Sequence, residues 1–533
     1  MLGLILPEIV IAVAAILILL TGFKFKKISG YIALLGIVAS LISLFVIAIH
    51  SINTTADSTA VITIAEGISI FYNVGLLAVV FKFIFLIVGL MAVIASLKYT
   101  EKFIYFQIFD AYYALILFAI LGMLVVASAA DLLTLFVGLE MAAIPAYVLV
   151  AIEKTKKGIE GAAKYFLFGA VFSAILLFGI SLIYFSTGSL MLDQIGTLYP
   201  GEDENLKLLT FIGILAIMLG LAYEMSAAPF HFWAPDAYQG APSPVSALLA
   251  GASKKMAFVA LLKISVVFMV LFKFELTVML AILAILSMIV GNVLALAQKD
   301  VRRMLAYSSI AQVGYILAAI AIFTPLGIAY AIYYIIVHAF MKGGAFIAAG
   351  ALLFVSDGKI KNYDDYKGLW RTAPITAFAM AAFMLSLAGI VPFGGFTAKI
   401  LVLVELFVQA MENNIIALIL GVVMIITSVI SLYYYGRLIK YMWFVEPKGM
   451  EDISDKHGEQ HGEHNEHNKN NEHNEHNKNN EHNEHIEVKF EKFKEPIAFV
   501  IPMLIAVIAL LILFYAPPFV EICTNIVHSL GVS

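Results

Sequence analysis

Long apolar runs separated by short polar loops make up almost the whole sequence. A run of roughly 20 apolar residues is long enough to cross a bilayer as a helix, and the chain contains about fourteen such runs. They lie near residues 2–22, 30–49, 73–97, 110–129, 131–152, 161–186, 208–230, 242–271, 274–297, 303–323, 326–355, 373–411, 414–445 and 495–519. The pattern predicts an all-α polytopic membrane protein with about 14 transmembrane helices.

Composition supports this prediction and excludes a soluble core. Hydrophobic residues make up 62% of the 533 positions and charged residues 13%, and the mean hydropathy is +0.96. The single Cys523 rules out an internal disulfide, and the net charge of −4 argues against nucleic-acid binding. No basic residues precede the first run, so we expect a retained helix and not a cleaved signal peptide.

Basic residues are concentrated in every second loop. They are Lys24, Lys26, Lys27, Lys98, Lys102, Lys154, Lys156, Lys157, Lys164, Lys299, Arg302, Arg303, Lys359, Lys361, Lys367 and Arg371. Cytoplasmic loops of membrane proteins carry an excess of Lys and Arg. We therefore expect a multi-pass protein of the cell membrane, with these loops in the cytoplasm and both termini outside.

One predicted cytoplasmic segment, residues 447–494, departs from the apolar pattern. It repeats EHNEHNKNN in tandem and holds eight of the twelve His residues. Such a composition buries too little apolar surface to fold, so we expect a disordered low-complexity repeat. The alternative is a weak metal-binding segment, because closely spaced His residues can share a divalent ion.

Ionisable residues also occur inside the apolar runs, where each costs about 2.5–3.5 kcal/mol near a helix centre. The main candidates are Glu140, Glu224, Lys254, His338, Lys342 and Lys399, and the supporting candidates are Lys82, His231, Lys255, Gln312 and Glu405. Ion pairs that merely hold the bundle together are one interpretation, but buried pairs rarely stabilise more than apolar packing does. We favour a proton relay, in which acids and bases on neighbouring helices pass protons through water.

Helix-breaking residues interrupt two of the runs beside these charges. Pro229 interrupts the seventh run, and Pro392, Gly394 and Gly395 interrupt the twelfth, just before Lys399. Broken helices at membrane depth are tolerated where the backbone is buried in protein or lines a cavity, and they bring half-helix ends to ion sites. We expect such cavities here, and packing kinks without a cavity are the alternative.

Several motifs resemble the antiporter-like subunits of respiratory complex I. They are LFVGLEMAAIPAY, PFHFWAPDAYQGAPSPVSALLAGASKK, RRMLAYSSIAQVGY, HAFMKGGAF and LAGIVPFGGFTAK, with LPE near the N-terminus. The stretch PDAYQGAPSPVS resembles subunit N of that family. The HAFMK and SKK stretches also suit subunit N of the archaeal F(420)H(2) dehydrogenase, so the electron donor stays open.

The resemblance implies a core of two inverted five-helix repeats, with discontinuous helices 7 and 12. The chain then divides into five parts. They are helices 1–3 (residues 1–109), a first repeat of helices 4–8 (110–272), a second repeat of helices 9–13 (273–446), the His-rich segment (447–494) and a last helix (495–533).

The resemblance also implies a non-redox, proton-translocating subunit of an enzyme complex that couples NADH, F(420)H(2) or ferredoxin oxidation to reduction of a quinone-type carrier. Glu140 resembles the glutamate of helix 5, Lys254 the central lysine of helix 8 and Lys399 the terminal lysine of helix 12. The implied partners are other membrane subunits, of the L, M, K, J, A and H types, the quinone-type carrier that they bind, and lipid. No cofactor is expected in this subunit, because it has no Cys cluster, haem motif or nucleotide fingerprint.

Two residues depart from the family pattern. Glu224 stands where the family usually has a lysine that pairs with the glutamate of helix 5. We hypothesise that Glu140 and Glu224 share a proton, because two adjacent carboxylates in low dielectric resist double ionisation. Alternatively Lys82 compensates their charge, unless it extends to the outer interface. Gln312 stands where relatives often have His, which leaves one relay step to water.

A second function stays open, namely a subunit of an Mrp-type Na⁺/H⁺ antiporter or of a membrane-bound hydrogenase. The YQGAP stretch favours the complex I type, and the HAFMK stretch is neutral to slightly contrary.

Overall fold

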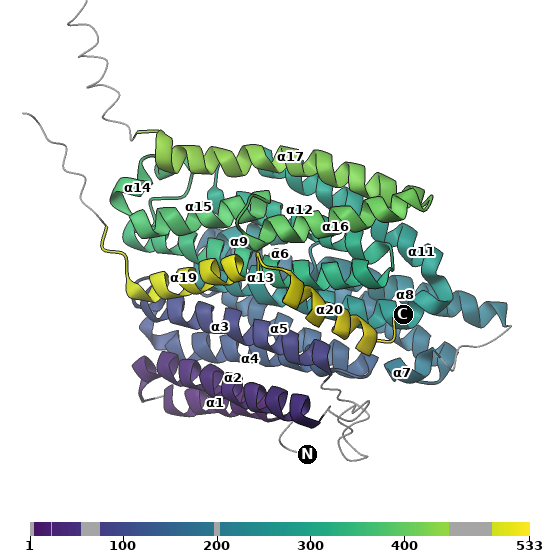
Figure 1. The fold of residues 1–533 in the computed structure, drawn as a ribbon. Coiled ribbons are helices and arrows are strands. Elements are labelled where there is room, and N and C mark those ends of the chain that lie inside the picture. The colour runs from purple at the N-terminus through teal and green to yellow at the C-terminus, as the bar shows by residue number, and fades with distance from the viewer. Residues whose placement is uncertain (1–4, 23, 55–74, 197–202, 447–492, 533) are drawn as a thin grey trace, which may run out of the picture.

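The computed structural model describes residues 5–22, 24–54, 75–196, 203–446 and 493–532. These residues form long helices that lie side by side (Figure 1). The described part of the chain contains no β-strand, only isolated bridges between Asp131 and Met191 and between Asp300 and Asn362. The predicted all-α class is therefore confirmed. The polar loop 55–74 and most of the His-rich segment lie outside the described residues.

Within the described residues, eleven helices are long and apolar enough to cross a membrane, or twelve if a bent pair counts as one span. The first half of the chain forms α1 (Leu6–Gly22), α2 (Ser29–Thr54), α3 (Leu76–Phe103), α4 (Phe109–Ser128), α5 (Leu132–Ala151), α6 (Lys156–Thr187), α7 (Leu192–Ile195) and α8 (Glu204–Glu224). The second half forms α9 (Ala234–Gly240), α10 (Ser243–Leu248), α11 (Lys254–Leu296), α12 (Val301–Ala321), α13 (Pro325–Val355), α14 (Leu369–Thr372), α15 (Pro374–Ala388), α16 (Gly394–Met411), α17 (Ile415–Phe444), α19 (Ile497–Ile512) and α20 (Pro517–Ser529).

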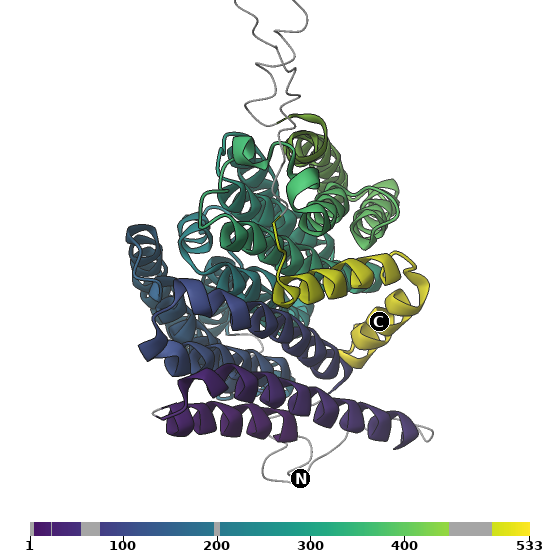
Figure 2. The ribbon, with the colours of Figure 1, turned by 90° about the vertical axis from the view of Figure 1, so that its left-hand side faces the viewer.

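The core is built around α12 and α13. Their apolar windows are 94% and 100% buried inside the protein, whereas that of α6 is 28% buried. Figures 1 and 2 place α1 and α2 at one edge of the molecule and α17 at the opposite edge. Polar groups on α12 and α13 are therefore enclosed by other helices and kept away from lipid.

Both predicted helix breaks are present. The first separates α8 from α9 and contains Pro229. The second separates α15 from α16, and there Gly389 adopts φ +84°, which favours glycine. A Cβ atom at Gly395 would lie 1.9 Å from the carbonyl oxygen of Ser386, so only glycine fits where α16 begins. The first break starts at Glu224, earlier than the predicted end of that run at residue 230.

Two further features differ from straight single spans. The stretch Ser243–Leu296 has 54 residues, which at 1.5 Å per residue is roughly 80 Å and more than twice a bilayer core. Its backbone leaves the helical region at Phe272 (φ −133°, ψ 39°), between the predicted runs 242–271 and 274–297. The last run, expected as one helix over 495–519, is bent by 85° between α19 and α20, because Pro517 begins a new helix there.

Candidate functional site

Glu140 and Glu224 line one small cavity between α5, α6 and α8. Ser173 of α6 donates a hydrogen bond from its Oγ to Oε1 of Glu140. The cavity has a volume of about 10 Å³ and its other walls are mostly Phe and Leu side chains, so it has room for about one water molecule. The structure thus brings the two predicted carboxylates to one place, with Glu224 as the last residue of α8.

Lys82 on α3 has a partner that the sequence did not reveal. Its Nζ lies 2.7 Å from Oε1 of Glu8, and the two side chains are 0% and 5% exposed. Glu8 belongs to the first turn of α1. Both expectations for Lys82 are therefore wrong, because it is paired with Glu8 instead of Glu140 and Glu224, and it is too deeply buried to extend to the interface.

The two adjacent lysines at the start of α11 have different neighbours. A π-helical turn, Leu249–Ser253, precedes them, and such turns are frequent at functional sites. Lys254 donates from Nζ to Oγ of Ser309 at 3.1 Å and lies 5.4 Å from the ring centroid of Tyr238. Lys255 donates to the carbonyl oxygen of Ala250 on the preceding turn. Lys254 is therefore the lysine that faces α12.

α13 contributes His338 and Lys342, which are both 0% exposed. Lys342 donates from Nζ to the carbonyl oxygen of Leu305 at 2.9 Å and to Oγ of Ser308. Neither ring nitrogen of His338 has a hydrogen-bond partner among the described residues. A buried polar group left without a partner costs about 1–3 kcal/mol, so the ring nitrogens of His338 do not stabilise the fold through hydrogen bonds to the described residues.

Lys399 joins the two halves of the second broken helix. Its Nζ donates to the carbonyl oxygen of Ala388, the last residue of α15, at 3.1 Å. It also lies 5.2 Å from the ring centroid of Tyr315 on α12. Lys399 is therefore held between the end of one half-helix and the aromatic ring of a neighbouring helix.

Two supporting candidates lie near this end of the site. Gln312 accepts a hydrogen bond from the hydroxyl of Tyr334 and donates to the carbonyl oxygen of Leu387 at 3.3 Å. It therefore links α13 to α15 through α12. Glu405 accepts from Oγ1 of Thr324 at 2.7 Å, at the N-terminus of α13.

One helix, α12, contacts three of these buried cations in turn. It places Ser309 beside Lys254, Ser308 and the carbonyl of Leu305 beside Lys342, and Tyr315 beside Lys399. All of these partners are uncharged. The motif RRMLAYSSIAQVGY was recognised in the sequence, but the role of its serines was missed, because residue spacing alone does not reveal which helices surround α12.

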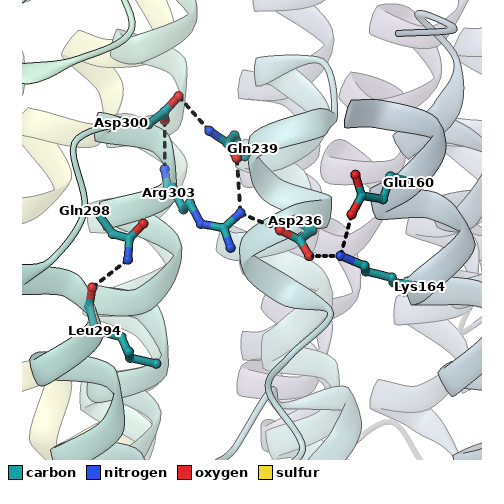
Figure 3. Close-up of polar contacts among 8 residues, drawn as sticks. All are labelled: Glu160, Lys164, Asp236, Gln239, Leu294, Gln298, Asp300 and Arg303. Atoms are coloured by element: carbon teal, nitrogen blue, oxygen red, sulfur yellow. Dashed lines mark hydrogen bonds and ion pairs between the residues drawn. The ribbon is translucent and has the colours of Figure 1, made fainter. Parts of the chain in front are cut away.

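A separate cluster of charges lies where α9 meets α6 and α12 (Figure 3). Asp236 of α9 accepts from Lys164 of α6 at 2.6 Å and from Arg303 of α12. Gln239 donates to Asp300, the N-cap of α12, at 2.8 Å. A cavity of about 390 Å³ opens beside these residues. The sequence did not predict this cluster either, because Asp236 and Gln239 were interpreted only as part of the PDAYQG resemblance.

His231 lies in the break between α8 and α9, near this cluster. Its ring centroid is 6.4 Å from that of Tyr307 on α12, and its Nδ1 has no partner among the described residues. No group of His, Cys, Asp and Glu in the described part of the chain is arranged to hold a metal ion.

A helical membrane bundle with two broken helices and a row of buried bases has the architecture of an ion-translocating membrane protein. The family model described as "NADH:quinone oxidoreductase/Mrp antiporter, TM" matches residues 129–430. The chain belongs to this family.

Several known proteins are similar to the chain over most of its length. It is 41% identical to F(420)H(2) dehydrogenase subunit N of Methanosarcina mazei, a match that covers 83% of this chain and 89% of the relative. It is 37% identical to NADH-quinone oxidoreductase subunit N of Desulforamulus reducens, over 71% of this chain and 77% of the relative. A chain of respiratory complex I from Thermus thermophilus, 28% identical, superimposes with a TM-score of 0.71 and covers 96% of this chain and 97% of that one.

Proposed function

We propose that this chain is the N-type proton-translocating membrane subunit of a complex I-like redox pump. Its partners, membrane subunits of the L, M, K, J, A and H types with the electron-input subunits, oxidise NADH, F(420)H(2) or ferredoxin and reduce a quinone-type carrier. This chain moves protons and has no cofactor or redox chemistry of its own. The names of its relatives, both of them N subunits of redox complexes, support the proposal.

The row of buried lysines beside α12 carries this proposal. Lys254, Lys342 and Lys399 have neutral oxygens or aromatic rings as their neighbours. A lysine with a neutral partner can lose its proton without leaving a buried carboxylate uncompensated, so it is suited to pass protons through water. His338 extends the row, and Lys255 lies beside it.

In this relay Glu140 and Glu224 form one end and share a proton across their cavity. Lys254 is the central site, and Lys399 with Glu405 forms the other end. Gln312 links the helices on either side of α12. Relatives often have a histidine at this position, and the proton-transfer step that a histidine would carry is left to water here.

The chain crosses the membrane about fourteen times in this proposal. This number counts α1 as a span, divides Ser243–Leu296 at Phe272, joins the halves of each broken helix and treats α19 with α20 as one span. The basic loops face the cytoplasm, and both termini lie outside.

Similar features recur in residues 110–272 and 273–446, which supports two five-helix repeats. α4 and α5 pack closely through Gly122, where a Cβ atom would lie 2.4 Å from the backbone nitrogen of Ala142. α11 and α12 pack in the same way through Gly291, where a Cβ atom would lie 2.4 Å from the backbone nitrogen of Ala311. An aspartate caps the second helix of each pair, Asp131 for α5 and Asp300 for α12.

Purification of the intact complex tests the proposed function. We expect electron-input subunits to purify with this chain, and we expect electron transfer in proteoliposomes to drive proton movement without added Na⁺. Exchange of Na⁺ for H⁺ by a complex that lacks redox subunits would instead identify an Mrp-type antiporter subunit.

A further inference from the structure

One face of α5 exposes a carboxylate among apolar side chains. Leu133, Val137, Ile144 and Val148 are 46%, 51%, 56% and 50% exposed, and at about 100° per residue they share this face with Glu140. Glu140 is the ninth of the 20 residues of α5 and is itself partly exposed. The carboxylate therefore lies near the middle of the span, on a face that the described part of the chain leaves uncovered.

The cavity behind this face contains more acid than the shared proton can neutralise. Glu140 and Glu224 both line it, and none of its lining residues is a cation. Two carboxylates that share one proton still carry one net negative charge. A charge at membrane depth needs a partner, so the pair calls for a cation.

The three helices around the cavity do not supply this cation. α5 contains no Lys or Arg. The last lysine of α6 is Lys164, which lies nine residues before Ser173, roughly 13 Å along the helix, and is already paired with Asp236. The lysine of α8 is Lys207, which lies seventeen residues before Glu224, roughly 25 Å along that helix. The charge of the carboxylate pair is therefore not balanced by α5, α6 or α8.

Neither lipid nor a second copy of this chain suits the exposed face of α5. Charged side chains inside a membrane almost always face other protein or a water-filled cavity, so hydrocarbon is a poor neighbour for Glu140. A second copy related by a two-fold axis would place its own Glu140 opposite this one, and like charges brought together at an interface are costly. The face instead fits a different subunit with a basic side chain at this depth.

We propose that α5 docks a membrane helix of another subunit of the complex, and that a lysine or arginine of that helix balances the charge of Glu140 and Glu224. This inference rests on the proposed function and gives the carboxylate end of the relay a partner. The partner cation balances the pair as a whole, whichever carboxylate holds the proton, so the proton stays free to move between them. Asp236 differs, because a single carboxylate there lies between two cations.

Photo-crosslinking in the intact complex tests the docked helix. The photoreactive residue p-benzoylphenylalanine replaces Ile144, which lies about one helical turn from Glu140, and mass spectrometry identifies the linked peptide. We expect a link to a membrane helix of another subunit, with a lysine or arginine within about two helical turns of the linked residue. A link only to a second copy of this chain, a linked helix without a basic residue, or no link to protein would overturn the inference. Replacement of Val148 gives the same readout if the first variant fails to assemble.

Two substitutions of Val137 test the partner's cation. Val137→Lys puts a second cation about one turn from Glu140, where it should repel the partner's basic side chain, so we expect the amount of that subunit in the purified complex to fall by about threefold or more. Val137→Glu is the matched control with the opposite charge and should retain the subunit. Equal amounts of the subunit in the two variants, or a greater loss in Val137→Glu, would overturn the partner cation.

Lys254→Met separates this inference from the proposed function. If Lys254→Met pumps protons normally, the proposed function itself fails, whatever helix α5 docks. If Lys254→Met stops pumping and the residue at position 144 links to no other subunit, the proposed function stands and the docked helix is excluded.

Discussion

The charged side chains of two regions in this protein have opposite kinds of partner. Where α9 meets α6 and α12, Asp236 lies between Lys164 and Arg303, so opposite charges are in direct contact. Around the middle of α12, Lys254 and Lys342 have hydroxyl and carbonyl oxygens as their hydrogen-bond partners. The first region is partly exposed, and the second is almost completely buried.

The difference distinguishes charges that stabilise the fold from side chains that can gain or lose a proton. An ion pair fixes the protonation state of both partners, because loss of either charge leaves the other uncompensated. A buried lysine beside neutral oxygens has no such partner, so it can gain or lose a proton at lower cost. We infer that the paired region holds the broken helix in place and that the unpaired region carries protons.

The largest effect is expected at the far end of the unpaired region. Lys399→Met removes the proton-accepting nitrogen between α15 and α12 and should lower proton pumping by about tenfold or more, since positioned acids and bases contribute about that much or more. Pumping and electron transfer are measured together in proteoliposomes. Lys207→Met, at the exposed end of α8, is the control. Equal pumping by the two variants would remove Lys399 from the relay.

Glu224→Gln tests the carboxylate end of the proposed relay, where Glu140 and Glu224 line one cavity. The amide fills the same volume but cannot share a proton with Glu140, so proton pumping should fall by about threefold or more. Glu204→Gln changes a carboxylate at the exposed end of the same helix and should have no effect. Unchanged coupling in Glu224→Gln would exclude an essential role for this carboxylate.

Asp236→Asn tests the paired region. Loss of the carboxylate leaves Lys164 and Arg303 without its charge, and we expect about 1–3 kcal/mol lower stability, because the pair is partly exposed. Thermal unfolding of the purified complex measures this loss. The number of protons moved per electron should stay unchanged, and a lower ratio at unchanged stability would assign this cluster to proton transfer.

The smallest effect is expected from the His-rich segment. Deletion of residues 457–485 should leave proton pumping unchanged, since none of the residues assigned to the relay lies in this stretch. Loss of pumping in the deletion variant would instead support a metal-binding or coupling role for the repeat.

The sequence predicted the helices well, because membrane spans are set by local apolar length, and it also predicted both breaks, because Pro and Gly act locally. The partners of the charges were harder to predict. Lys82 pairs with Glu8 on a helix some seventy residues away, and Lys263 of α11 donates to the carbonyl oxygens of Val126, Ala127 and Ala129 at the end of α4, more than 130 residues away. Such contacts depend on how the helices pack, which spacing along one chain does not encode.

A comparison of Lys254→Met with Lys164→Met in proteoliposomes tests the central claim most directly. Both variants remove a lysine near α9 and α12, one with a neutral partner and one paired with Asp236 and Glu160. The account predicts that the number of protons moved per electron falls by about tenfold or more in Lys254→Met while electron transfer continues, and that Lys164→Met keeps the native ratio. Native pumping by Lys254→Met, or an equal loss in both variants, would contradict it.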